Sequence, residues 1–169
     1  MNKLIIVMVL VTSLSCSLDE SDKMHEGILT PGLLINGIKS FSGIDKIDVL
    51  KDTTNFMVLE DSKLTAGDKR PPYSIYSVSI PYSHMGVTGN LIFSFFNNRL
   101  MSTWFYPIDQ KAYLVALSNN GVNLNNVSER KISEYVRIWK YKDFNGKFYV
   151  AWEDIRLRKE QNDWISRYS

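Results

Sequence analysis

Apolar and polar side chains alternate most clearly in the middle of the chain, where two serines separate Tyr76, Val78 and Ile80. Successive side chains of a strand point to opposite faces, so this pattern predicts a strand with one apolar face. Pro81 has no backbone N–H to donate to a neighbouring strand, and we therefore expect the strand to end there. Residues 81–89 are then expected to form a loop.

A hairpin is predicted between residues 91 and 106, because two apolar stretches flank the pair Asn97-Asn98. Asparagine tolerates the positive φ that a two-residue hairpin turn requires at both positions. The register that such a turn fixes places Leu91 opposite Trp104 on one face of the sheet.

A second hairpin is predicted over residues 135–155, with its turn at Asn145-Gly146. This residue pair is typical of a two-residue turn. The resulting register places Trp139 opposite Trp152, so that one face of the hairpin is aromatic and the other polar. We expect the two indoles to be neighbours across the strands.

Helices are predicted where apolar residues recur at helical spacing behind a capping residue. Ser42 and Asp109 each precede such a pattern, and a third pattern near the C-terminus places Leu157 and Trp164 on one face. We expect helices at about residues 43–51, 109–117 and 157–168.

These elements predict an α+β fold, in which an antiparallel sheet formed by a meander and a C-terminal hairpin packs with two or three short helices. The polar residues 61–72 are expected to be a surface loop. Residues 28–169 suit a single globular domain, and the aromatic content of 12% predicts an aromatic core.

The N-terminus has a different pattern. Lys3 is followed by eight apolar residues, 4–11, and then by small polar residues. A helix that crosses a bilayer needs about 20 predominantly apolar residues, so this run is too short to remain as a membrane span. The charge, the short apolar run and the small residues after it indicate a signal peptide over residues 1–15.

The residues Ser13-Leu14-Ser15-Cys16 resemble the lipobox of bacterial lipoproteins. The resemblance implies that Cys16 is lipidated on its sulfur, becomes the new N-terminus and anchors the chain to a membrane. The alternative is ordinary signal-peptide cleavage, to which Ser13 and Ser15 are also suited, with a soluble secreted product. Cys16 is the only cysteine and cannot form an internal disulfide, which favours lipidation.

The residues after the cysteine extend this resemblance. Ser17 is not Asp, the usual signal for retention in the inner membrane, so the resemblance implies the periplasmic side of the outer membrane if the host has two membranes. Residues 16–27 are polar without a period and are expected to be a flexible tether. In residues 40–106, a short helix followed by an aromatic meander resembles in layout the small periplasmic lipoproteins of the BamE type.

Charge adds little to this picture. Without residues 1–15, the chain keeps 19 basic and 18 acidic side chains. Because this balance provides no excess of positive charge for a phosphate backbone, we expect no nucleic-acid partner.

The inventory of reactive residues argues against an enzyme. The chain has two histidines, His25 in the tether and His84 in a loop, and its only cysteine is committed to the anchor. It has no nucleophile elbow, zinc-protease motif, phosphate-binding loop or dinucleotide-binding motif. We therefore expect no catalytic residue, no metal site and no cofactor.

Acidic pairs are the remaining candidates for acid–base chemistry. Asp45 and Asp48 are expected on a solvated helix face. The adjacent Glu153-Asp154 pair is expected at a strand end, where Arg137 and Arg156 neutralise it.

Tyr82, His84 and Met85 are the candidate binding residues, because binding residues concentrate in loops carried by a rigid scaffold. The alternative for His84 is a solvated turn residue without a function. The aromatic faces are expected to be core, with a binding groove as the alternative. They comprise Trp104, Tyr106, Trp139 and Trp152.

The sequence thus predicts an envelope lipoprotein that acts without catalysis through protein contacts, as an assembly factor, an inhibitor or an immunity protein. A carrier of a small apolar ligand, with a pocket between sheet and helix, is the second hypothesis. An unrecognised hydrolase is the third.

Overall fold

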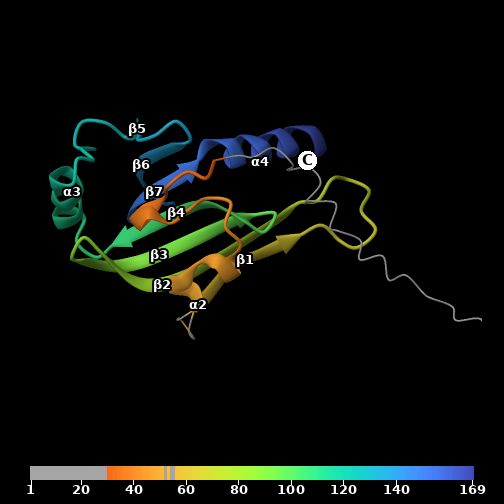
Figure 1. Ribbon diagram of the computed structural model, residues 1–169, viewed down its shortest axis with the longest axis horizontal. Coiled ribbons are helices and arrows are strands. Elements are labelled where there is room, and N and C mark those ends of the chain that lie inside the picture. Colours follow the sequence, from red (N-terminus) through yellow and green to blue (C-terminus); the bar gives the residue numbers. More distant parts are fainter. Residues whose placement is uncertain (1–29, 52, 54–55) are drawn as a thin grey trace, which may run out of the picture.

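The computed structural model describes residues 30–51, 53 and 56–169, and these form an α+β fold (Figure 1). Seven antiparallel strands make one sheet in the order β1-β2-β3-β4-β7-β6-β5. A meander of four strands is thus joined to a C-terminal hairpin, which confirms the predicted fold class. The signal peptide, Cys16 and the tether lie outside the described residues.

The elements follow one another as four strands, a helix, three strands and a helix, after an N-terminal segment with short helical turns. The strands are β1 (Met57–Lys63), β2 (Ser74–His84), β3 (Val87–Phe96), β4 (Arg99–Pro107), β5 (Glu129–Lys131), β6 (Val136–Lys142) and β7 (Phe148–Asp154). The helical elements are 3-10 turns at Ile35–Gly37 and Ile44–Lys46, and α-helices α2 (Asp48–Lys51), α3 (Gln110–Asn119) and α4 (Ile155–Tyr168). The polar loop predicted at residues 61–72 begins three residues late, because β1 continues to Lys63.

The helices lie close to their predicted positions. Asp109 caps α3, since its Oδ1 accepts a hydrogen bond of 2.9 Å from the backbone N–H of Ala112. Gly121 follows this helix with a φ of +82°, which is the usual geometry of a helix end. At the C-terminus, Leu157 and Gln161 of α4 are buried against the sheet.

The prediction that β2 ends at Pro81 is wrong. Pro81 pairs with Asn90, and the strand continues to a turn at Met85-Gly86, where φ is +53° and +78°. The described pairing of β1 with β2 ends at Ser79, two residues before Pro81. A strand tolerates a proline there, because that position does not need a backbone N–H to bond to β1. Residues 81–89 therefore form a hairpin rather than a loop.

The turn predicted at Asn97-Asn98 is confirmed, with φ values of +47° and +59°. The register beyond it differs, because a bulge between Ser94 and Phe95 shifts the pairing by one residue. Leu91 therefore pairs with Phe105 and not with Trp104.

The turn of the second hairpin is one residue longer than predicted. The side chain of Asp143 accepts hydrogen bonds of 2.9 Å from the backbone N–H groups of Asn145 and Lys147, and Gly146 alone has a positive φ, of +77°. A three-residue loop with glycine at its last position results. This register pairs Trp139 with Ala151 rather than with Trp152.

The two indoles therefore lie on opposite faces of the hairpin, and the predicted contact between them is wrong. Trp152 pairs with Ile138 and is buried in the core, whereas Trp139 is half-buried on the other face beneath the guanidinium of Arg137, 5.0 Å from its ring.

The two faces of the sheet are covered differently. On one face, the N-terminal segment 30–51 and α3 cover the main core; on the other, α4 covers one end of the sheet through Leu157. Figure 1 shows α3 and α4 near opposite ends of the sheet. The main core includes Leu34, Ile35, Ile47, Leu50, Val78, Ile80, Leu91, Phe93, Phe105, Tyr113, Leu117, Ile138, Val150 and Trp152.

Candidate functional site

The face of the sheet that α4 covers only in part holds a hollow with an aromatic floor. We call it the open-face hollow; its volume is about 490 Å³. Strands β1 to β4 form its floor, α4 one end, and the tip of the β6–β7 hairpin part of its rim. Its lining comprises Leu59, Glu60, Tyr73, Ile75, Ser77, Ile92, Ser94, Met101, Trp104, Tyr106, Phe144, Arg158 and Gln161.

A row of aromatic rings crosses the floor. The Trp104 and Tyr149 rings are stacked, with centroids 5.3 Å apart and an interplanar angle of 12°, and Tyr106 packs on Tyr149 at 5.2 Å. Tyr149 is almost fully buried and does not line the hollow, whereas Trp104 and Tyr106 are half-buried and do. The core position predicted for Trp104 and Tyr106 is therefore wrong, because both half-buried rings line a hollow at the surface of the sheet.

Neutral polar groups lie beside the rings. Ser77 Oγ donates a hydrogen bond to Ser94 Oγ at 3.3 Å, and Trp104 Nε1 donates to Ser102 Oγ at 2.9 Å. Burial raises the pKa of Tyr106 to about 12, with a smaller contribution from the charge of Asp143. The Tyr106 hydroxyl is therefore neutral at physiological pH and serves as both donor and acceptor.

The α4 end of the hollow is held by an ion network. Glu153 is buried beneath it, and its Oε1 accepts hydrogen bonds of 3.0 and 2.7 Å from Arg137. Its Oε2 accepts from Arg158, which also donates to Gln161. Arg158 and Gln161 are thus fixed where they line the hollow. Arg137, which is predicted to help neutralise the Glu153-Asp154 pair, bonds to Glu153.

The rim opposite α4 is apolar and exposed. Phe144, at the tip of the β6–β7 hairpin, is 98% exposed. Leu59, on edge strand β1, is 46% exposed. Apolar side chains so exposed at the mouth of an aromatic hollow are typical of a contact surface.

The structure separates the three candidate binding residues predicted in the loop. Met85 lies in the β2–β3 turn and is 38% exposed. Tyr82 lies on β2, and its hydroxyl accepts a hydrogen bond of 2.8 Å from Asn36 Nδ2. His84 is buried, so the alternative that it is a solvated turn residue is also wrong.

His84 is enclosed by aromatic rings. Its centroid lies 5.8 Å from Tyr113, 6.0 Å from Phe105 and 5.8 Å from Trp152, and its Nδ1 is 2.7 Å from the Tyr113 hydroxyl. Burial lowers the pKa of His84 and raises that of Tyr113, so both groups are neutral at physiological pH. This pair belongs to the core and stabilises the end of β2 against α3.

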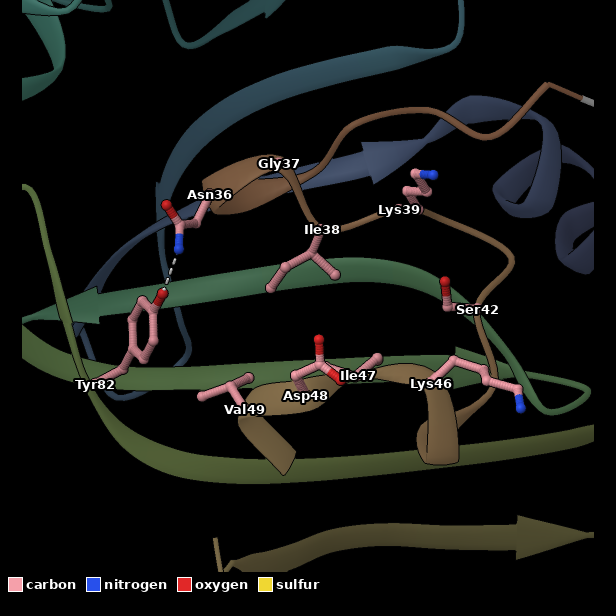
Figure 2. Close-up of a pocket in the computed structure, with 10 residues that line it drawn as sticks. All are labelled: Asn36, Gly37, Ile38, Lys39, Ser42, Lys46, Ile47, Asp48, Val49 and Tyr82. Atoms are coloured by element: carbon pink, nitrogen blue, oxygen red, sulfur yellow. Dashed lines mark hydrogen bonds between the residues drawn. The ribbon is translucent and has the colours of Figure 1, made fainter. Parts of the chain in front are cut away.

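A second hollow, of about 360 Å³, lies between the N-terminal segment and β2. Figure 2 shows the Tyr82–Asn36 hydrogen bond at one end, Lys46 at the other, and Ile38 and Val49 between them. Lys46 and Asp48 are paired with their neighbours Asp45 and Lys51 at 3.1 and 2.8 Å. These ion pairs lie at the surface, which leaves this hollow without a buried polar group directed at a ligand.

Comparisons with known proteins add no assignment: the chain matches no protein family, no curated protein and no solved structure. Among residues 30–51, 53 and 56–169, no three or more His, Cys, Asp or Glu side chains are grouped so as to hold a metal ion. Within the same described ranges, no helix has the length and apolar character to cross a bilayer.

Proposed function

We propose that the protein is exported, is anchored in the cell envelope by a lipid on Cys16, and acts there by binding another envelope macromolecule without catalysis. The sequence supports the anchor through the eight-residue apolar run, the lipobox-like residues Ser13 to Cys16 and the single cysteine. In a host with two membranes, Ser17 favours the periplasmic side of the outer membrane.

One observation carries the binding part of this proposal: the sheet buries aromatic residues under one face and presents half-buried rings in the open-face hollow on the other. Trp104 and Tyr106 contribute rings, and Phe144 extends the apolar surface to the rim. An aromatic patch surrounded by polar groups is typical of a surface that binds a partner and loses its bound water on binding. Assembly, inhibition and immunity are all roles that such a surface can serve.

A carrier of a small apolar ligand is less well supported. Such a ligand favours an enclosed apolar cavity, whereas the open-face hollow has an exposed rim at Phe144 and two serines in its floor. A hydrolase would draw on His84 as a general base. That ring is buried against Tyr113, away from the open-face hollow.

The anchor is tested by Cys16→Ser in a host that lipidates exported proteins. We expect this change to abolish labelling of the protein by a fatty-acid analogue and to leave the precursor uncleaved, because the acceptor sulfur is missing. The unchanged protein is the control, and both forms are followed by gel mobility. Normal processing of the Cys16→Ser protein would show ordinary secretion and refute the anchor.

The binding surface is tested by placing a photo-reactive amino acid at position 144 of the full-length protein in cells. We expect illumination to give a reproducible adduct, because the Phe144 side chain is exposed at the rim of the hollow. Position 115 on α3 is the matched control, since Val115 is also exposed, at 59%, but lies outside the hollow. No adduct at 144, or the same adducts at both positions, would refute the open face as the contact surface.

A further inference from the structure

We propose that the open-face hollow binds an uncharged segment of a glycan chain. This inference rests on the proposed function and names the class of its partner. Three properties of the described residues carry it: the aromatic rings of the floor, the neutral hydrogen-bonding groups beside them, and the lack of clustered charge in the lining.

The rings supply the apolar part of the recognition. A sugar ring has a C–H face that packs on an aromatic ring and a rim of hydroxyls that needs hydrogen-bond partners. Tyr149 stacks on one face of Trp104 and holds the indole in place, while the indole still lines the hollow together with Tyr106. Because the stack already fixes these side chains, little conformational entropy is lost when a ligand packs on them.

The polar groups match hydroxyls better than they match ions. Ser77, Ser94 and Tyr106 each contribute a hydroxyl, and Gln161 contributes an amide. Ser77 already donates to Ser94, and Gln161 Oε1 already accepts from Arg158, so the three hydroxyl oxygens are the acceptors and Ser94 and Tyr106 the hydroxyl donors toward a ligand. The four side chains lie on β2, β3, β4 and α4, and therefore surround the aromatic floor rather than cluster at one point. Such distributed neutral groups suit a ligand that carries a hydroxyl on most of its carbon atoms.

The charged residues of the lining are few and do not form a cluster. Arg158 is paired with the buried Glu153, whereas Glu60 is an exposed carboxylate that accepts a hydrogen bond of 3.0 Å from Ser62. With one cation and one anion, the lining shows none of the clustered cations that a phosphorylated or acidic polymer attracts. An uncharged ligand fits this balance.

The dimensions favour a glycan over a folded protein as the occupant. A stable protein–protein interface buries about 800 Å² on each partner, generally over a broad surface. The open-face hollow is instead a concavity of about 490 Å³, within the range of roughly 300–1,000 Å³ that is typical of small-ligand sites. A few sugar units in a longer chain are ligands of that scale.

The test measures binding of four uncharged probes, cellotetraose, chitotetraose, maltotetraose and mannotetraose, to the detergent-solubilised full-length protein by calorimetry. We expect at least one probe to bind with a Kd below about 1 mM, the affinity of a weak specific ligand. Phe144→Ala should weaken that binding at least fivefold while leaving the melting temperature unchanged, because Phe144 is 98% exposed. Trp104→Ala should abolish binding.

Trp139→Ala is the matched control, since Trp139 is half-buried on the same face of the sheet but lies outside the lining. It should leave binding unchanged. The proposal is overturned if none of the probes binds with a Kd below about 1 mM, or if Phe144→Ala binds as tightly as the unchanged protein. If no probe binds and protease digests the position-144 adduct down to peptides alone, the partner is a protein, and the proposed function survives without its glycan.

Discussion

Replacing Asp154 by alanine should lower the free energy of unfolding by about 3–5 kcal/mol, the range observed when one partner of a buried ion pair is removed. Asp154 is fully buried, and its Oδ2 accepts hydrogen bonds of 2.6 Å from Arg156 Nη2 and 2.7 Å from Ser40 Oγ. Its Oδ1 accepts from the backbone N–H of Arg156 at 3.0 Å and so caps α4. One carboxylate therefore connects β7, α4 and the N-terminal segment.

The loss is large because the remaining groups cannot return fully to water. The Arg156 guanidinium is packed over the ring of Tyr135 at 3.8 Å and near that of Phe41 at 5.0 Å. Without Asp154, this charge stays partly buried and uncompensated, and Ser40 loses the acceptor that orders its segment. Urea unfolding of both proteins measures the difference.

Asp154→Asn separates the charge from the cap. Asparagine is as good a capping residue as aspartate, so it should retain the α4 cap and lose only the ion pair. We expect Asp154→Asn to be at least about 1 kcal/mol more stable than Asp154→Ala, because a helix cap typically contributes that much to stability. Equal stability of the two variants would mean that the cap contributes nothing.

The pH dependence follows from the same contacts. Burial would raise the pKa of Asp154, but hydrogen bonds from Arg156 and Ser40 outweigh it and hold that pKa below its ordinary value of 3.8. A carboxyl with a lowered folded-state pKa stabilises the protein above the ordinary value, and this contribution is lost as the pH falls toward the folded-state pKa. The free energy of unfolding of Asp154→Asn should therefore fall less steeply than that of the unchanged protein as the pH is lowered below 3.8.

The turns show how far local sequence determines this fold. Asn97-Asn98 is predicted correctly because both residues adopt the positive φ that a two-residue turn needs. Asn145-Gly146 has the stronger signature of a two-residue turn. The Asp143 side chain nevertheless accepts hydrogen bonds from two backbone N–H groups, and the turn is one residue longer. An aspartate two positions before the pair is a local signal, and it could have predicted the longer turn.

The location of the open-face hollow could not be predicted in the same way. A one-residue change of register moves every side chain of a strand to the other face. The bulge near Ser94 places Trp104 on the open face, and the longer turn at Asp143 does the same for Trp139. The extra residue of this bulge is Met101 on β4, and nothing in the residues that flank it distinguishes a bulged strand from a regular one. The sequence therefore predicts core positions for the aromatic residues of the hollow.

The acidic pair is the part of the interior that the sequence predicted best. The expected position of Glu153-Asp154 at a strand end indicates Arg137 and Arg156 as partners, and in the structure Arg137 pairs with Glu153 and Arg156 with Asp154. What the sequence did not indicate is the depth of burial: neither Glu153 nor Asp154 is exposed to solvent. Burial depends on the packing of α4 and the N-terminal segment, which are distant contacts.

Replacing Glu153 by alanine should destabilise the protein by about 2–4 kcal/mol, somewhat less than the loss at Asp154. The side chain of Glu153 is 1% exposed and bonded to two guanidinium groups, of Arg137 and Arg158. The arginine side chains are 34% and 24% exposed, so water can solvate them in part once the carboxylate is gone. Chemical denaturation gives the free energy of unfolding of each variant.

A double variant distinguishes a charge effect from a loss of packing. Once Glu153 is alanine, Arg158 is an uncompensated charge at the edge of the hollow. We therefore expect the double variant Glu153→Ala, Arg158→Met to lose less free energy of unfolding than the sum of the losses of the two single variants, by about 1 kcal/mol or more. Arg158→Met also keeps most of the volume of the arginine stem. Strict additivity of the two losses would show that Glu153 and Arg158 do not stabilise each other, and that Arg158 does not depend on Glu153 for its position at the hollow.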